Sequence, residues 1–208
     1  MGFYLVVKPS PFILYCDHEI RLFTVYRLIC CLPLLSTFFS MSSDQQKNIY
    51  LGLGSNLGDR AGNLLLGIRG LLNAGLTISR LSQIYETEAV ETFAQPPFLN
   101  MVVELHGHPV ASPEEIMALL LRVEQTLGRT RALAKGPRTI DLDLLLYGNA
   151  TCDTPSLTLP HPRLHARRFV LVPLVELAPD IIHPTLNQTM SALLATLADD
   201  SEVRPWRT

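Results

Sequence analysis

From about residue 48 onward, apolar residues recur with strand and helix periods in one fixed order, and this order constrains the fold more than any other feature of the sequence. Two segments place apolar residues every third or fourth position, as a helix with one buried face requires. Four shorter segments have the apolar, β-rich character of strands and lie at residues 49–53, 76–87, 98–105 and 139–147. The order predicts an α+β fold of the ferredoxin-like βαββαβ type, an antiparallel sheet with both helices on one face. Two short helices near residues 170–177 and 190–197 are expected as C-terminal additions.

Both core helices have recognisable ends in the sequence. The first is predicted to begin after Asp59, a residue suited to cap an N-terminus, and to end near residues 73–75. The second is predicted to begin after Ser112, because Pro113 at the first helical position and Glu115 three residues after the cap complete a capping box. The expected apolar faces are Leu64, Leu65, Ile68, Leu71 and Leu72 in the first helix, and Ile116, Leu119, Leu120, Val123 and Leu127 in the second.

The composition of the 208-residue chain is that of a globular domain, with 48% hydrophobic and 17% charged residues. A chain of this length buries roughly 70% of the surface that its unfolded form exposes, so one ordinary core is expected. The formal net charge of −2 argues against a protein that coats nucleic acid or a membrane, and we expect neither partner. Only Cys152 lies beyond residue 40, so no disulfide framework is expected and the reducing cytoplasm is favoured.

Residues 1–40 differ from the rest of the chain because they contain an apolar, aromatic-rich run at 22–39. A spanning helix needs about 20 apolar residues, and Arg27 near the middle of the run would cost a few kcal/mol in a bilayer. A signal peptide fits the basic residues before the run, but no clear cleavage site follows. We expect the domain to comprise 41–208, starting at Met41, and residues 1–40 to be an upstream or dispensable extension, with a targeting segment or a real structural element as the alternatives.

Two aspartates, Asp141 and Asp143, flank Leu142 within the predicted strand 139–147. Because the side chains of a strand alternate between faces, the two carboxylates are expected to project from the same side. Like charges this close repel unless a cation lies between them, and Mg²⁺ is commonly held by one or two carboxylates together with substrate phosphates. A solvated strand end is the alternative for such a pair taken alone.

Basic residues are concentrated just before and just after this acid pair in the sequence. The guanidinium fork of arginine matches phosphate oxygens, so basic residues near a metal-binding pair favour a metal–nucleotide complex as the ligand. A basic surface loop that binds RNA is the alternative, but the aromatic residues that usually accompany such loops are absent. The two basic segments comprise Arg129, Arg131, Lys135 and Arg138, and His161, Arg163, His165, Arg167 and Arg168.

The glycine-rich turn GLGSNLGD at residues 52–59 matches neither of the common nucleotide-binding signatures. It lacks the Gly-Lys-Ser/Thr ending of a P-loop, and Leu57 stands where a dinucleotide-binding motif has its third glycine. Close approach of the backbone to a ligand, or a tight turn from strand to helix, remains as the explanation of its glycines.

Four segments together resemble the 6-hydroxymethyl-7,8-dihydropterin pyrophosphokinases of folate biosynthesis. They are IYLGLGSNLGDR, YETEAVETFAQPPFLNMVVEL, GRTRALAKGPRTIDLDLLLYGN and LTLPHPRLHARRFVLVPLVELAPDIIHP. The resemblance spans about residues 48–185, and GPRTIDLDLLLYG followed by LPHPR is its most specific part.

The resemblance implies an enzyme that transfers the terminal pyrophosphate of ATP to the hydroxymethyl group of the pterin and releases AMP, using two Mg²⁺ ions. By position, Asp141 and Asp143 would bind both metal ions. The implied catalytic residues are Arg129, Arg131, Arg138, Asp141 and Asp143, with Arg131 on a loop that closes over the triphosphate. The implied ATP-binding residues are Arg129, Arg138, His161 and Arg167, with Glu124 in a supporting role.

The resemblance also implies a pterin pocket, in which two aromatic rings would stack on opposite faces of the heterocycle. These rings would be Phe98 and Phe169, and the complete implied set is Thr87, Val90, Phe98, Asn100 and Phe169. ATP and the pterin are the partners expected, and the chain is expected to be a monomer.

Two other functions stay open from the residues alone. A ferredoxin-like module that binds RNA would need exposed aromatic residues on the sheet, and the strand 139–147 is mostly aliphatic. A metal-dependent phosphohydrolase could use the same two aspartates with water as the nucleophile, and it would hydrolyse ATP without pterin.

Overall fold

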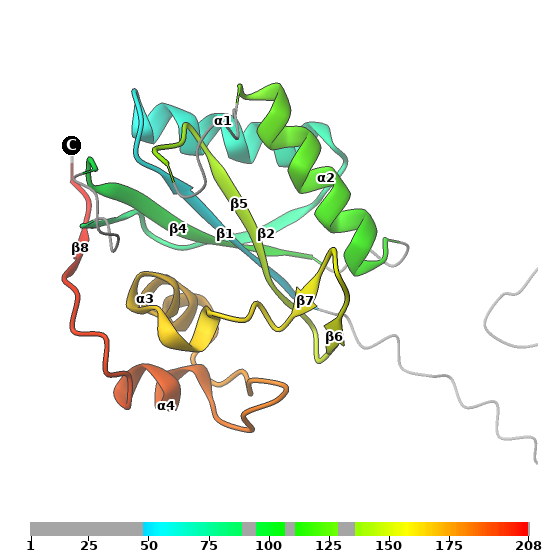
Figure 1. Cartoon of the computed structure of the whole chain (residues 1–208), viewed down its shortest axis with the longest axis vertical. Coiled ribbons are helices and arrows are strands. Elements are labelled where there is room, and N and C mark those ends of the chain that lie inside the picture. The colour runs from blue at the N-terminus through cyan, green and yellow to red at the C-terminus, as the bar shows by residue number, and fades with distance from the viewer. Residues whose placement is uncertain (1–47, 89–94, 107–110, 129–135, 208) are drawn as a thin grey trace, which may run out of the picture. The chain divides into compact units, whose positions relative to one another are not determined.

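The computed structural model of the chain describes residues 48–88, 95–106, 111–128 and 136–207 (Figure 1). The extension 1–40 and the domain boundary at Met41 lie outside these residues, so both stay predictions.

One antiparallel sheet forms the centre of the described domain (Figure 1). Its strands follow the order β5-β1-β4-β3-β8, and β2 also pairs with β4. With the two helices between them, these strands give the predicted ferredoxin-like arrangement, so the fold class is confirmed. The strands are β1 (Ile49–Ser55), β2 (Ile78–Leu81), β3 (Tyr85–Thr87), β4 (Phe98–Leu105), β5 (Asp141–Tyr147) and β8 (Val203–Pro205).

The segment 76–87, expected to be one strand, is two strands interrupted at residues 82–84. The Ser82 hydroxyl accepts the Val102 backbone N–H at 2.9 Å, a place that a backbone carbonyl would otherwise fill. The next N–H, that of Gln83, donates to the Glu176 carboxylate and not to β4. The Ser82 N–H still donates to Val102 O, so side chains replace only part of the ladder here, which alternation alone does not predict.

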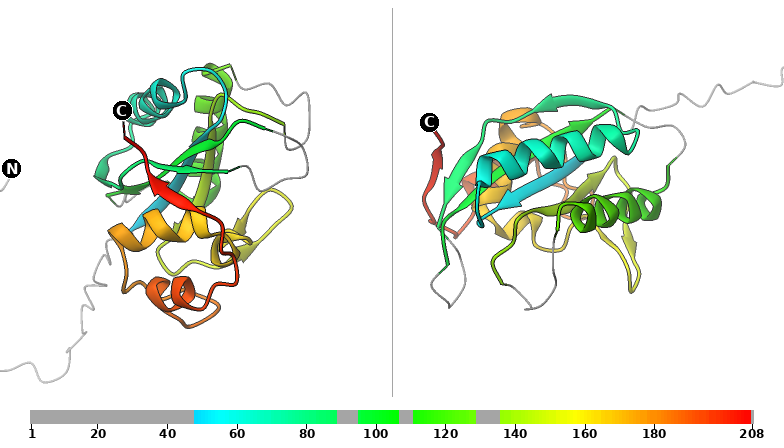
Figure 2. Two further views of the ribbon diagram at one scale, coloured as in Figure 1. Left: turned by 90° about the vertical axis from the view of Figure 1, so that its left-hand side faces the viewer. Right: turned by 90° about the horizontal axis from the view of Figure 1, so that it is seen from above.

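The two core helices, α1 (Arg60–Asn73) and α2 (Pro113–Thr126), cover one face of the sheet, as Figure 2 shows. Their predicted caps are confirmed: Asp59 caps α1 with its carboxylate, and Ser112 and Glu115 form the capping box of α2. A backbone N–H that is otherwise unpaired at each helix start thereby gains an acceptor.

The buried face of α1 is narrower than the sequence predicts. Leu65 and Leu72 are 63% and 51% exposed, so their expected place in the core is wrong. The buried residues of α1 are Leu64, Gly67 and Leu71, and the partly buried Ile68 packs against the same core. A Cβ at Gly67 would lie 3.2 Å from the Ile140 side chain, so this glycine lets the helix approach the sheet closely. A count of apolar residues misses a buried position that glycine occupies.

The opposite face of the sheet is partly covered by the C-terminal part of the chain. It contains the 3-10 turn η1 (Leu164–Ala166) and the helices α3 (Arg168–Leu177) and α4 (Met190–Ala195), which confirms the two additional helices (Figures 1 and 2). A second apolar core joins α3 and α4 to the sheet. A hairpin of β6 (Cys152–Asp153) and β7 (Thr158–Leu159) lies between β5 and η1 in the sequence. Among the described residues, no helix has the length and apolarity needed to cross a bilayer.

Candidate active site

A cavity of about 660 Å³ lies on the α3 side of the sheet. Strands β1, β3, β4 and β5 contribute to its lining, together with η1 and the start of α3. The sequence-predicted site residues that line it are Thr87, Phe98, Asn100, Arg138, Asp141, Asp143, Arg167 and Phe169. Residues as distant in the chain as Thr87 and Phe169 thus meet in one hollow, because the sheet places β1, β3, β4 and β5 side by side and α3 packs against β4.

The acid pair of β5 faces this cavity, as strand alternation predicts. Asp141 and Asp143 both line it, whereas Leu142 between them is buried in the core under α1 and α2. Arg138 pairs with the first carboxylate, with 2.7 Å between its Nη1 and Asp141 Oδ2. Both side chains of this pair are less than a quarter exposed, so the contact is only partly screened by water.

The glycines of the turn at residues 52–59 have a specific place opposite the acid pair. Gly52 is directly across the β1–β5 ladder from Asp143, and Gly54 is across from Asp141. Both glycines line the cavity. A Cβ at Gly54 would lie 3.0 Å from Asn100 Oδ1, so a side chain there would displace the amide. Of the two explanations left by the sequence, close approach of the backbone to a ligand site is the one that this arrangement favours.

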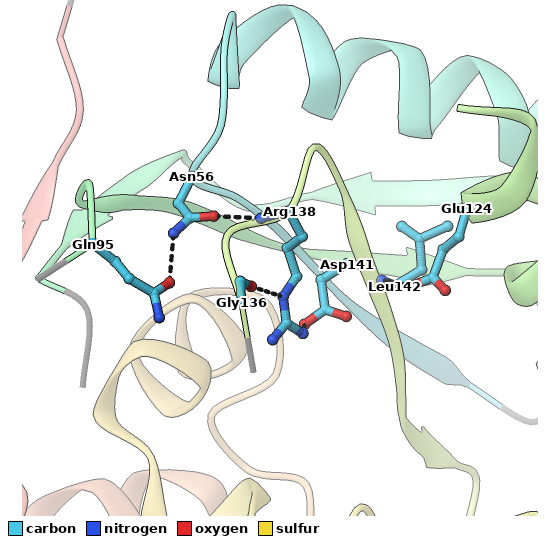
Figure 3. Close-up of polar contacts among 7 residues, drawn as sticks. All are labelled: Asn56, Gln95, Glu124, Gly136, Arg138, Asp141 and Leu142. Atoms are coloured by element: carbon cyan, nitrogen blue, oxygen red, sulfur yellow. Dashed lines mark hydrogen bonds and ion pairs between the residues drawn. The ribbon is translucent and has the colours of Figure 1, made fainter. Parts of the chain in front are cut away.

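Asn56, which the sequence pattern did not single out, connects the segment just before the acid pair to a neighbouring loop (Figure 3). Its side chain is buried, and its Oδ1 accepts the Arg138 backbone N–H at 2.8 Å. Its Nδ2 donates to Gln95 Oε1 at 3.1 Å, and Gln95 also lines the cavity. One amide therefore fixes the backbone of Arg138 and the segment before β4 together. The only sequence signal was a polar residue in a turn, which is common on protein surfaces.

A second part of the cavity combines aromatic rings with a buried amide. Asn100 Nδ2 donates to Thr87 Oγ1 at 2.8 Å across the β3–β4 pair, and both residues are buried. Phe98 and Phe169 line the same cavity from β4 and α3. The guanidinium carbon of Arg167 lies 5.3 Å from the centre of the Phe169 ring. Rings with a few fixed polar groups are suited to a flat heterocycle with hydrogen-bonding edges.

His161 does not line this cavity itself, and its expected contact with the triphosphate stays a prediction. It lines a smaller hollow of about 470 Å³, beside β6, β7 and residues 183–186. Burial, Arg167 and Arg163 lower the pKa of His161 to about 4, and Asp141 opposes this shift. The Arg163 backbone N–H donates to His161 Nδ1 at 3.3 Å, so the neutral ring carries its proton on Nε2.

Glu124 also lies away from the cavity, and the supporting role expected of it at the ATP site stays a prediction. It is 2% exposed on α2, on the opposite side of the sheet from the cavity. Its Oε1 accepts the backbone N–H of Leu142 at 2.8 Å (Figure 3). Because Leu142 separates the two aspartates, this bond fixes the backbone that carries them.

The carboxylates fit a magnesium site of the kind completed by substrate. In the described part of the chain, no three His, Cys, Asp or Glu side chains are grouped closely enough to hold a metal by themselves. Mg²⁺, however, is usually bound through one or two carboxylates plus phosphates and water, and Asp141 and Asp143 offer such a pair. Three predicted site residues, Val90, Arg129 and Arg131, lie outside the described residues.

Comparison with known sequences identifies the family. The model of the 7,8-dihydro-6-hydroxymethylpterin-pyrophosphokinase family matches residues 50–179. The chain belongs to this family. All residues that line the cavity fall within the matched range, whereas residues 1–47 precede it.

Relatives of this pyrophosphokinase family differ in how much of their length the chain matches. A 2-amino-4-hydroxy-6-hydroxymethyldihydropteridine pyrophosphokinase of Bacillus subtilis is 38% identical over 159 residues, which are 76% of this chain and 89% of that protein. The folic acid synthesis protein fol1 of Pneumocystis carinii is 33% identical over 166 residues, 80% of this chain. The chain spans only 22% of the length of fol1.

The likeness extends to a solved structure. The wild-type HPPK-DHPS of Plasmodium falciparum with pteroate superposes with a TM-score of 0.57 and 15% identity, over 73% of this chain and 44% of that chain. At this identity the likeness shows the fold alone, and it agrees with the α+β arrangement described above.

Proposed function

We propose that this chain transfers the pyrophosphoryl group of ATP to 6-hydroxymethyl-7,8-dihydropterin, giving the pterin diphosphate and AMP. The observation that carries the proposal is the cavity, which places an aromatic, amide-bearing subsite beside a pair of carboxylates and arginines. Membership of the pyrophosphokinase family supports the same reaction. A flat heterocycle and a metal-bound polyphosphate need these two halves next to each other.

The polar half of the cavity is suited to neutralise the negative charge of the triphosphate and of the leaving AMP. The triphosphate repels an attacking oxygen, and AMP must leave with additional negative charge. Asp141 and Asp143 would hold two Mg²⁺ ions, which would neutralise charge on the phosphates when bound. Arg138 and Arg167 line the same cavity, and their guanidinium groups would contact phosphate oxygens directly. These charges are fixed before the reaction, so little reorganisation is needed in the transition state.

The aromatic half orients the acceptor. Phe98 and Phe169 would stack on the pterin, while Asn100 and Thr87 would hydrogen-bond its edge. The hydroxymethyl oxygen then attacks the β-phosphorus, the bond from this phosphorus to the oxygen of the α-phosphate breaks with its electron pair leaving on AMP, and the hydroxyl proton is released to solvent. Holding both substrates in line can supply several kcal/mol of the barrier. No side-chain nucleophile is required. Val90, Arg129 and Arg131 keep the roles predicted from the resemblance.

One assay tests this function and separates it from the two alternatives. The full chain is mixed with ATP, Mg²⁺ and the hydroxymethyl dihydropterin, and the products are identified by mass. We expect a diphosphorylated pterin and AMP in equal amounts, and no product after Mg²⁺ is removed with a chelator. ATP hydrolysis without pterin would indicate a phosphohydrolase. RNA binding without any turnover would indicate a binding module.

Three further properties belong to the same proposal: a monomeric state, a cytoplasmic location and small molecules as the only partners. Light scattering of the purified chain, fractionation of the source cells and a nucleic-acid binding assay test them in turn. None of these results bears on the reaction itself.

A further inference from the structure

Arg163 has a backbone that is fixed relative to the acid pair of β5. The His161 backbone N–H donates to Leu145 O in β5 at 3.0 Å. The Arg163 N–H donates to His161 Nδ1, and the next residue, Leu164, is completely buried. The start of η1 is therefore tied to the strand that carries Asp141 and Asp143, and the Arg163 side chain leaves it from a rigid point.

The side chain of Arg163 differs from those of the other two arginines in the cavity. Arg138 is paired with Asp141, and Arg167 lies against the Phe169 ring. Arg163 lines the cavity as well and is exposed, but its guanidinium has no acid or hydrogen-bond acceptor among residues 48–88, 95–106, 111–128 and 136–207. Its donors are thus free to meet an anion that enters the cavity from outside.

The surroundings of His161 place Arg163 at the polar end of the cavity. The charges of Arg163 and Arg167 lower the pKa of His161, and the charge of Asp141 raises it. Because charges interact over a limited distance in a partly solvated site, all three lie near this one imidazole. The nearest charged group of a bound substrate would therefore be the polyphosphate beside the aspartates.

We propose that Arg163 is a further ATP-binding residue, whose guanidinium contacts the triphosphate from η1. The inference rests on the proposed function, since it assumes that the polyphosphate lies beside Asp141 and Asp143. A guanidinium presents paired N–H donors that match two phosphate oxygens, which a lysine ammonium cannot do. Because Arg163 has no ion pair to break within the described residues, its contact with phosphate requires no competing partner to leave.

Arg168 provides a matched control. It belongs to the same basic run and begins α3, where its backbone N–H donates to Asp199 Oδ2, but it does not line the cavity. Substitution of Arg163 or of Arg168 by a neutral residue removes one positive charge from the same basic segment. Only the change at Arg163 is expected to affect bound nucleotide strongly.

The test compares R163Q, R163K and R168Q in the full chain. Calorimetry with ATP and Mg²⁺ in the absence of pterin is expected to give a Kd about tenfold higher for R163Q and about twofold or less for R168Q, the size of one charge-assisted contact. The Kd of R163Q should also depend less on salt concentration, because one ionic contact is missing. R163K should recover part of the loss, and binding of adenosine, which has no phosphate, should not change.

Several results would overturn the inference. ATP binding by R163Q at the wild-type Kd would do so, as would an equal loss with ATP and adenosine, or an equal loss in R168Q. If R163Q has a lower Tm, R163K decides the matter, since a binding role predicts a raised Kd in a normally folded variant. The product assay keeps the two proposals apart. A wild-type chain that makes no pterin diphosphate while R163Q still loses ATP binding refutes the function alone. An active wild type with R163Q at the same KM for ATP refutes only the role of Arg163.

Discussion

The two faces of the sheet use one strand, β5, in opposite ways. Toward α1 and α2 it presents Leu142 and Leu144, which are buried in a closed apolar core. Toward α3 it presents Asp141 and Asp143, which line an open cavity. Burial of the leucines stabilises the fold, whereas two like charges on one side of a strand repel each other. The alternation of a single strand therefore separates the residues that hold the domain together from those that are suited to bind a ligand.

The largest effect is expected from the open face. Asp143→Asn should lower turnover by about a thousandfold or more, because a carboxylate that would hold the metal is lost. The Tm should stay the same or rise slightly, since repulsion with Asp141 disappears. Steady-state formation of AMP and thermal unfolding measure the two quantities. Asp180→Asn, an exposed residue outside the cavity, is the control. Near-normal turnover of the Asp143 variant would remove the metal-binding role.

The closed face should give the reverse result. Leu144→Ala deletes a buried side chain from the core under α1 and α2, and we expect the free energy of unfolding to fall by about 2–5 kcal/mol. The folded fraction should keep a kcat within a few-fold of the wild type, because Leu144 does not line the cavity. Urea unfolding and turnover at low temperature provide the data. A stable but inactive variant would show that the two faces are not separable.

Glu124 connects the two faces, so its removal should affect both properties. Glu124→Ala leaves the buried N–H of Leu142 without this acceptor, which we expect to cost about 1–3 kcal/mol of stability. It should also lower kcat, because the backbone between the two aspartates loses its support. Glu124→Gln retains an acceptor at the same place and should lose less of both. Equal damage by the two variants would mean that the carboxylate charge matters more than the hydrogen bond.

What could be predicted from the sequence follows the same division. The boundaries of β4 at Phe98–Leu105 and the capping box of α2 were predicted correctly, because alternation and caps depend on neighbouring residues. The acid pair was placed on the cavity face for the same reason. In contrast, Asn56 acts through partners 39 and 82 positions away, Gln95 and Arg138, and no local pattern contains that information.

The features that the sequence did not reveal have a common physical origin. Glu124 supports β5 from the opposite face and His161 lines a neighbouring hollow, and neither contact can be read from their positions in the sequence. Leu65 and Leu72 were assigned to the core because apolar spacing does not reveal that Gly67 packs against Ile140. In each case the contact across the fold, not the residue type, decides the role.

The lowered pKa of His161 makes the free energy of unfolding depend on pH. In the folded chain its pKa is about 4, below the ordinary value of 6.5 that the unfolded chain retains. Between these values the unfolded state binds more protons, so the free energy of unfolding should fall as the pH decreases from about 6.5 toward 4. When the free energy of unfolding is measured with urea at several pH values in this range, it should change less with pH for His161→Asn than for the wild type. Parallel slopes would mean that the imidazole titrates normally in the folded state.

The smallest effect is expected on the outer side of α1. It tests whether the apolar core of the closed face ends at Leu64 or also includes Leu65. Leu65→Gln should change the free energy of unfolding by no more than about 0.5 kcal/mol, because the side chain is largely in water. Leu64→Ala, one residue earlier and completely buried, should cost several times more. Both changes remove an apolar side chain from the same helix turn, so helix propensity cannot explain a large difference. A loss at Leu65 as large as that at Leu64 would mean that another surface covers it in solution, and the helix would then have two buried faces.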